Sequence, residues 1–270
     1  MNTTNLTELL KSASLTEMLA DVIATIKAKP TDTDTRELLF KLYCIDGSWQ
    51  KALLQLETLT QLLPEFTKQA ELYKNLILSE KMRDEVLAGK RSPGTLGNDL
   101  PEWVALLQQA NQLHHDGDHQ QSEALREQAL QQAPESIGES AATGCFAWIA
   151  DSDGRMGPVC EFISAGGYRW IPFAEIQSLT VSKPKNITDL IWAPAQVKVK
   201  DKVWYGYIPA RYPLTPETDN ETKLGLKTEW HQPTDTFSLY IGAGRKMFIT
   251  DQGEHALFDI EEIVFEIDCV

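Results

Sequence analysis

Apolar residues in the first half of the chain recur at steps of three and four, which is the spacing of one face of an α-helix. Leu15, Met18, Leu19, Val22 and Ile26 give the first example. Proline or glycine interrupts the pattern several times, and these residues commonly end helices. We therefore expect helices at about 15–29, 35–45, 49–63, 66–87, 101–115 and 119–133.

The second half follows a different pattern, in which short β-branched and aromatic runs are separated by turn residues. Bulky residues alternate with others over 197–199 and 203–207, as in strands with one buried face, and Asp201-Lys202 suits a hairpin turn. These runs predict a mainly antiparallel β domain with one or two short helices. Strands are expected at Cys145–Ala150, Pro158–Ile163, Tyr168–Ile171, Gln196–Lys200, Val203–Ile208, Phe237–Ile241, Met247–Thr250 and Ile263–Ile267.

Residues 135–143 (ESIGESAAT) are small and polar, and they separate the two patterns. We interpret them as a linker. The sequence thus predicts an α+β protein with an all-helical domain at 1–134 and a β-rich domain at 144–270. A chain of 270 residues is long enough for two domains.

The helical half also contains a repeat. Pro30 and Pro64 are 34 residues apart, and Pro134 follows Pro64 by 70. Gly47 precedes Pro64 by 17 residues, and Gly117 precedes Pro134 by the same interval. A 34-residue period with a glycine turn and a terminal proline resembles the tetratricopeptide repeat, although the middle unit matches it poorly. We expect a tetratricopeptide-like helical domain, with a plain helical bundle as the alternative.

Composition narrows the possible partners. Asp and Glu outnumber Lys and Arg by 39 to 25, which gives a net charge of −14. Such a charge disfavours binding to nucleic acid and to anionic membranes, because both require basic residues. The sequence has no long apolar stretch and no basic signal-like start, so we expect a cytoplasmic protein. The four cysteines form no CxxC pair and are expected to be free thiols.

Motifs for metal binding and catalysis are weak. His114, His115 and His119 cluster, but Gly117 interrupts the helix that would align them on one metal ion. Residues 151–154 begin like a calcium loop and then lack its later acidic ligands, which favours an ordinary turn. The sequence contains no phosphate-binding loop, complete dinucleotide fingerprint or serine-hydrolase elbow. We therefore expect no metal and no cofactor.

Tryptophan beside proline and arginine is the most distinctive feature of the second half, which holds five of the seven tryptophans. Tryptophan and arginine dominate the binding energy of many protein interfaces. Buried tryptophans with arginines in internal ion pairs would give the same composition. The clearest stretches are WIPFAEI, DLIWAPA, YIPARYP and RKMFITD, at 170–176, 189–195, 207–213 and 245–251.

These stretches, in this order, resemble the ImpE/SciE/TagJ family of type VI secretion accessory proteins, and the similarity extends over nearly the whole chain. The helical half adds Arg36, Leu38, Leu39, Ala52 and the turn Gly47-x-Trp49. The resemblance implies a cytoplasmic, non-enzymatic adaptor without a cofactor. Such proteins bind the N-terminal helix of the small contractile-sheath subunit and are thereby linked to sheath recycling by the ClpV ATPase.

The candidate binding residues follow from this hypothesis. Helical repeats stack into concave surfaces that can hold an amphipathic helix. Trp49 and Trp103, near predicted helix starts, are the candidate groove contacts. Trp170, Arg211 and Trp230 are the candidates for a second, interdomain surface.

Two other functions stay open from the sequence alone. The β half could be a hydrolase-like enzyme that uses Cys160 or a carboxylate. In the cysteine version, His231 would activate Cys160 or Cys145 as the nucleophile. The chain could also be a chaperone for a secreted effector, which differs from the adaptor only in its partner.

Overall fold

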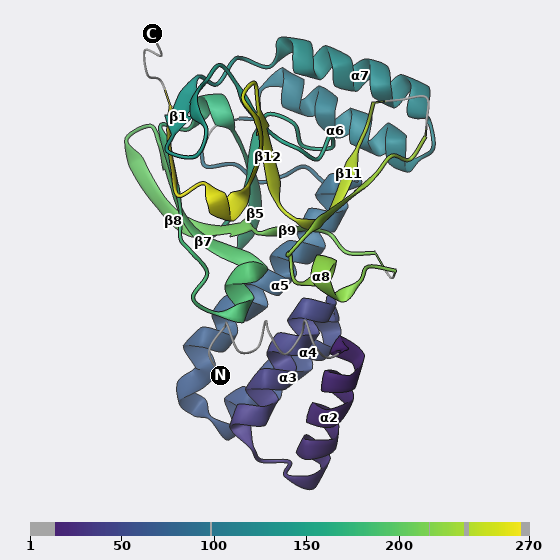
Figure 1. Cartoon of the computed structure of the whole chain (residues 1–270), viewed down its shortest axis with the longest axis vertical. Helices are drawn as coiled ribbons and strands as arrows, with labels where there is room; N and C mark the ends of the chain where they lie inside the picture. Colours follow the sequence, from purple (N-terminus) through teal and green to yellow (C-terminus); the bar gives the residue numbers. More distant parts are fainter. Residues whose placement is uncertain (1–13, 98, 216, 235–237, 266–270) are drawn as a thin grey trace.

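A computed structural model describes residues 14–97, 99–215, 217–234 and 238–265, and all structural statements below concern these residues. Figure 1 shows helices α2 to α4 at one end of the molecule and the β-strands together with α6 and α7 at the other. Helix α5 runs between the two ends. The chain is therefore an α+β protein with a helical N-terminal region, as the sequence predicts.

The long helices begin and end within about two residues of their predicted bounds. Such differences are ordinary, because helix ends fray and the terminal turn is loosely defined. The helices are α2 (Leu15–Ala28), α3 (Thr33–Asp46), α4 (Trp49–Leu62), α5 (Thr67–Leu87), α6 (Glu102–His115) and α7 (His119–Gln132).

Two helical hairpins, α3–α4 and α6–α7, carry the repeat seen in the sequence. Gly47 and Gly117 connect the helices of each pair, with φ of 75° and 91°, a left-handed conformation that favours glycine. Ala52 and Ser122 occupy equivalent positions five residues later and are both buried, so that the paired helices approach closely. The Ser122 hydroxyl also donates a hydrogen bond to the carbonyl oxygen of Ala110 on the neighbouring helix (2.8 Å).

The region between the hairpins explains why the middle repeat matches poorly. A short 3₁₀ turn, η1 (Pro64–Phe66), leads into α5, which is a single helix of 21 residues without a second helix packed back along it as a hairpin. It extends from the first hairpin to the sheet (Figure 1). Helix α5 is thus the element that joins the helical end of the molecule to the β-strands.

The β-strands form one large and two small sheets, with antiparallel pairing between neighbours. The large sheet has eight strands in the order β2-β1-β14-β6-β7-β8-β4-β5, and the small sheets have the orders β10-β11-β9 and β13-β12-β3. Short helices connect several strands: η2 (Phe173–Glu175), η3 (Ile187–Leu190), α8 (Asn220–Lys223) and η4 (Leu257–Asp259). The strands are β1 (Gly138–Ser140), β2 (Gly144–Phe146), β3 (Ile149–Asp151), β4 (Val159–Ser164), β5 (Gly167–Pro172), β6 (Ser178–Val181), β7 (Trp192–Val199), β8 (Lys202–Pro209), β9 (Arg211–Tyr212), β10 (Thr228–His231), β11 (Ile241–Arg245), β12 (Met247–Thr250), β13 (Gly253–Ala256) and β14 (Glu262–Phe265).

Several strand predictions need correction. The sequence does not predict strands β6, β9, β10 and β13, and β7 begins at Trp192 rather than at Gln196. The single strand expected at Cys145–Ala150 is two strands, β2 and β3, which belong to different sheets. The first residues of β7 are largely buried on both faces, so they lack the alternation that marks a half-exposed strand. The strand expected at 237–241 is not found, because β11 begins at Ile241 and residues 235–237 lie outside the described part.

Residues 135–143, expected to be a linker, include β1. Gly138 and Glu139 pair with β14 on one side and with β2 on the other, so this segment is part of the large sheet. The glycine in this segment has a packing role, because a Cβ atom at Gly138 would be 2.7 Å from the ring of Phe146. The division of the chain into two separately folding domains stays a prediction.

The hydrophobic core has two parts, one on each face of the large sheet. One cluster combines helical residues such as Leu56, Tyr73 and Leu107 with Trp170 and Trp192 of the sheet. The other lies between the large sheet and β12, with Phe162, Phe173 and Phe248 among its members. The first cluster is continuous across the predicted domain boundary, so the helices and the sheet share a core.

Candidate functional site

Buried charged side chains join α5 to the sheet, and we refer to Glu80, Arg83, Asp151, Asp153, Arg155, Glu161 and Lys246 as the ion network. Arg83 of α5 donates to both carboxylate oxygens of Glu161 on β4, from Nε at 2.6 Å and from Nη2 at 2.8 Å. It also donates to Glu80 (3.3 Å) and to the carbonyl oxygen of Arg211 (3.0 Å). Two-point pairing of this kind fixes orientation as well as distance, so it sets the position of α5 on the sheet.

Lys246 is a second buried cation in the network. Its ammonium group contacts Asp151 Oδ2 at 2.5 Å and also contacts Glu161. The Tyr212 hydroxyl donates to the other oxygen of Asp151 (2.8 Å), and the Tyr168 hydroxyl donates to Glu161 (2.5 Å). These partners compensate the cost of removing the charges from water.

The DSDG turn after β3 supplies the third part of the network. Asp151 accepts a hydrogen bond from the backbone amide of Asp153 (2.9 Å), and Asp153 binds the Arg155 guanidinium at 2.9 and 2.6 Å. Asp153 also accepts the backbone amide of Gly242 on β11 (2.9 Å). This turn, expected to be an ordinary turn without a metal ion, therefore anchors two small sheets to each other through buried carboxylates.

The network shifts the pKa of its carboxylates in opposite directions. Burial alone would raise the pKa of Glu161, but Arg83 and Lys246 outweigh it and lower that pKa to about 2. Burial raises the pKa of Asp151 to about 6, because the attraction of Lys246 offsets only part of the desolvation and Glu161 repels it. Glu161 therefore remains ionised throughout the neutral range, at the centre of the network.

Tryptophan and arginine side chains from the distinctive stretches surround this network. Trp192 Nε1 donates to Glu80 (2.7 Å), and Trp170 Nε1 donates to the Tyr168 hydroxyl (2.7 Å). Arg211 donates to the carbonyl oxygens of Cys44 and Ile45 at the end of α3, both at 2.7 Å, which satisfies the C-terminus of that helix. The four stretches thus supply much of the internal joint between helices and sheet.

A groove runs along the outer side of this joint, and we refer to it as the α5 groove. It consists of two cavities of about 220 and 360 Å³, which share Asp84 and Pro213 and therefore adjoin. The first extends to the α3–α4 turn, where it meets Gly47 and Trp49, and the second extends to the C-terminal end of α6. Its apolar lining consists of Trp49, Leu87, Ala88, Pro213, Leu214 and Ile241.

The five candidate binding residues lie in three different places. Trp49 and Arg211 line the α5 groove, and the Arg211 guanidinium lies 5.9 Å from the Trp49 ring centroid. Trp230 is 36% exposed on β10 and packs against Tyr212, with ring centroids 5.6 Å apart. Trp103 and Trp170 are 4% and 1% exposed and belong to the core cluster shared by the helices and the sheet, so Trp103 is not an exposed groove contact and Trp170 lies between the helices and the sheet. Partner binding by any of the five residues stays a prediction.

The α5 groove also contains residues that sequence reasoning missed. Asp84 and Asn111 line it, yet neither lies in a distinctive stretch. The available signal was weak: Asn111 occupies a core position of an amphipathic helix, where an amide is unusual. The ion network had a similar signal in the sequence, because charged residues stand at buried positions of α5 and β4: Glu80, Arg83 and Glu161.

The residues considered for catalysis lie apart from the groove. Cys160 is fully buried on the far face of the sheet, and burial raises the pKa of its thiol. An activated cysteine has the opposite properties, exposure and a lowered pKa. His114 and His119 are joined by a 3.1 Å contact between their Nδ1 atoms, and burial together with the nearby His119 lowers the pKa of His114 to about 4. No group of three or more potential metal ligands occurs among the described residues.

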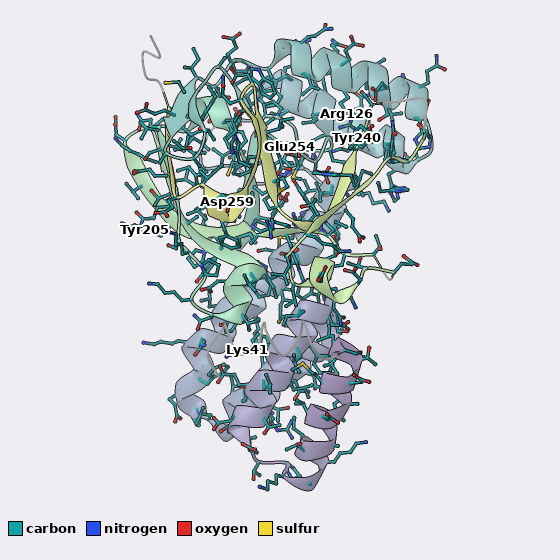
Figure 2. The ribbon with its side chains drawn as sticks, viewed as in Figure 1. Lys41, Arg126, Tyr205, Tyr240, Glu254 and Asp259 are labelled. Atoms are coloured by element: carbon teal, nitrogen blue, oxygen red, sulfur yellow. The ribbon has the colours of Figure 1, made fainter. Side chains whose placement is uncertain are left out.

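One further surface is apolar and exposed. A cavity of about 360 Å³ lies between α5 and the outer face of β7 and β8, with Tyr73, Trp192 and Tyr207 in its lining. Tyr205, two residues from Tyr207 on the same face of β8, is 71% exposed. Figure 2 shows Tyr205 at the outer edge of the molecule, far from Arg126 and Tyr240.

The described helices include none that is long and apolar enough to span a bilayer. The molecule is a two-part protein in which tetratricopeptide-like hairpins are fixed to a β domain through a shared core. A family model described as "ImpE protein" matches residues 143–264. The type VI secretion system accessory component TagJ of Pseudomonas aeruginosa strain PAO1 is 37% identical over 264 residues, which cover 96% of this chain and 90% of that protein.

The chain therefore belongs to the ImpE/TagJ family of type VI secretion accessory proteins. A crystal structure of protein VPA1032 from Vibrio parahaemolyticus has the same fold, with a TM-score of 0.88 at 24% identity. That similarity covers 97% of this chain and 98% of the other. The family assignment made from the four stretches is confirmed.

Proposed function

We propose that this protein is a non-enzymatic cytoplasmic adaptor that binds the N-terminal helix of the small contractile-sheath subunit. Through that contact it is linked to sheath assembly and recycling by the ClpV ATPase. The observation that carries the proposal is membership of a family of type VI secretion accessory proteins, by similarity over nearly the full length of both chains.

The α5 groove supports the proposal because its shape and lining suit a helix. It connects the turn of the first hairpin with the end of α6 along one side of α5. Apolar side chains from four separate segments line it, among them Trp49, Leu87, Pro213 and Ile241. An amphipathic helix buries its apolar face in such a groove, and the polar residues at the margin select its orientation.

The non-enzymatic part of the proposal is supported by the position of Cys160. The thiol lies in the second core cluster, where substrates have no access, and its raised pKa disfavours the thiolate. His231, the proposed base, belongs to β10 of a different sheet and is exposed. Cys160 and His231 therefore do not form the pair of groups that would activate a cysteine nucleophile.

Titration of a fluorescently labelled peptide from the N-terminus of the small sheath subunit tests the proposal. We expect saturable binding with a Kd of tens of micromolar or tighter. A scrambled peptide of the same composition is the control. Absence of binding at several hundred micromolar would contradict the proposed function, and co-purification of a secreted effector in place of the sheath subunit would favour the chaperone alternative.

A further inference from the structure

Two hydrogen-bond acceptors in the α5 groove have no partner among the described residues. The side chain of Asn111 is 1% exposed, and its Oδ1 atom accepts no hydrogen bond. The amide orientation is fixed, because Nδ2 donates to the carbonyl oxygen of Arg155 at 2.9 Å and only a nitrogen can do so. A buried acceptor without a partner costs about 1–3 kcal/mol, so a donor from outside the chain would be stabilising at this position.

Asp84 is the second of these acceptors. It lies where the two cavities of the groove meet, and its carboxylate forms no ion pair, although the adjacent charged residues of α5 do. Burial of part of the side chain raises its pKa, and the nearby Glu80 carboxylate adds to this, while Arg83 and Arg155, which are paired with other carboxylates, offset only part of the shift. A carboxylate in this position is stabilised by an incoming cation.

Three other charged groups that line the groove are in ion pairs within the chain. Arg83 is paired with Glu161 and Glu80, and Arg155 is paired with Asp153. Asp46 is paired with Lys223 at 2.7 Å. Arg211 also lines the groove, but it is 3% exposed and its guanidinium donates to the backbone carbonyl oxygens of Cys44 and Ile45. The exposed charge that the groove offers to a partner is therefore that of Asp84, in a protein whose net charge of −14 attracts basic segments.

We propose that the α5 groove receives a basic side chain, a lysine or arginine of a partner helix, between the Asp84 carboxylate and the Asn111 side-chain oxygen. This inference rests on the proposed function and adds the chemistry by which the partner is recognised. Apolar residues of the helix pack against Trp49, Pro213 and Ile241 on either side of the charged contact. An ammonium or guanidinium group supplies the donors that both acceptors lack, and its positive charge pairs with Asp84.

The exposed surface on β8 fits this role less well. The polar groups in the cavity beside it are occupied within the chain: Tyr73 Oη lies 3.3 Å from Thr188 Oγ1, and Asp189 accepts the backbone amides of Lys185 and Asn186. A partner bound at the β8 surface would make apolar contacts without a specific hydrogen bond or ion pair. The α5 groove offers apolar contacts together with unpaired polar groups.

The first test compares the sheath-subunit peptide on wild type, Asp84→Asn and Glu85→Gln. Glu85 is the matched control, since it is adjacent on α5, exposed, and paired with Arg91 outside the groove. We expect Asp84→Asn to weaken binding about tenfold and Glu85→Gln to change it less than twofold. Replacement of the anchoring lysine or arginine of the peptide by norleucine should weaken binding to wild type. The Asp84→Asn variant should bind the original peptide and the norleucine peptide with the same affinity.

Equal affinities for Asp84→Asn and Glu85→Gln would overturn the inference and leave the proposed function intact. A second measurement does not depend on the sheath peptide at all. Butylammonium and ethylguanidinium, titrated at millimolar concentration, should shift the NMR signals of the Asn111 side-chain amide and of the backbone near Asp84. Butanol should not. The inference is also overturned if the two cations leave these signals unchanged or shift them equally in Asp84→Asn.

Discussion

The ion network and the α5 groove meet at the same joint, where Glu80, Arg83 and Arg155 belong to both, and they differ in how completely their polar groups are paired. In the network, Glu161 alone accepts from Arg83, Tyr168 and Lys246. In the groove, the buried Asn111 side-chain oxygen accepts no hydrogen bond from the described residues, and none of them forms an ion pair with the exposed Asp84. A saturated network stabilises the fold, whereas unsatisfied groups in a cavity provide a place for a ligand.

This contrast changes the interpretation of the distinctive stretches. Trp170, Trp192, Arg211 and Lys246 all belong to them, and all are buried at the joint. Each of these buried side chains has several partners at the joint between helices and sheet. The residue types in the stretches are therefore restricted by packing and hydrogen bonding within the chain. The groups available to a partner lie outside them, in helices whose sequence is unremarkable in composition.

Removal of Glu161 gives the largest expected effect. In Glu161→Gln, Arg83 and Lys246 lose a shared buried counter-charge, so the free energy of unfolding should fall by about 3–5 kcal/mol. Urea denaturation measures it. Glu85→Gln removes an exposed charge from a partly solvated pair and should change stability by less than about 0.5 kcal/mol. Similar losses of unfolding free energy in Glu161→Gln and Glu85→Gln would contradict the claim that the ion network stabilises the fold more than an exposed ion pair does.

The pH dependence of stability gives the next largest effect. The pKa of Glu161 is lowered to about 2 in the folded state, below its ordinary value of 4.5, so its contribution is fully present above about pH 4.5. That contribution, on the order of 3 kcal/mol, is lost as the pH falls towards 2. The stability difference between wild type and Glu161→Gln should therefore shrink over this range. A difference that stays constant from pH 5 to pH 2 would contradict the assignment.

Trp192→Phe tests the hydrogen bond from a distinctive stretch to α5. The substitution removes the donor to Glu80 and leaves a small cavity, so we expect a loss of about 1–3 kcal/mol in thermal or urea unfolding. Trp230→Phe is the comparison, because Trp230 is 36% exposed and donates no hydrogen bond within the described residues to α5. Its effect should stay below about 1 kcal/mol. Equal losses of stability in Trp192→Phe and Trp230→Phe would contradict the claim that the buried hydrogen bond from Trp192 to α5 stabilises the joint.

Asp84→Asn should have the smallest effect on stability. Its carboxylate has a raised pKa and no ion-pair partner, so removal of the charge should leave the free energy of unfolding within about 0.5 kcal/mol of wild type or raise it slightly. The same variant should bind the partner peptide more weakly. A marked destabilisation would assign Asp84 to the fold rather than to the groove.

Much of the helical architecture could be predicted from the sequence, because the 3.6-residue pattern and the Gly47 and Gly117 turns are local signals. The sheet was predicted less completely. Trp192 to Ala195 are largely buried on both faces and show no alternation, and the pairing of Gly138 with β2 and β14 depends on residues far away in the sequence.

The candidate site was predicted only in part for the same reason. Trp49 was expected in a groove and lines one, whereas Trp103 and Trp170 are core residues. Composition alone cannot separate an interface tryptophan from a buried one. Asp84 and Asn111 come together only because α5 and α6 meet beside the loop at Pro213, which no local pattern indicates.

Hydrogen–deuterium exchange with and without the sheath-subunit peptide tests the central claim most directly. The groove is lined by helix ends and turns at 46–49, 84–88, 111–115 and 213–215, and amides at such positions open more easily than those in the middle of an element. We predict that the peptide slows exchange in these segments and leaves the outer face of β7 and β8, including Tyr205, unchanged. Protection confined to β7 and β8, with no change along α5 and α6, would contradict the account.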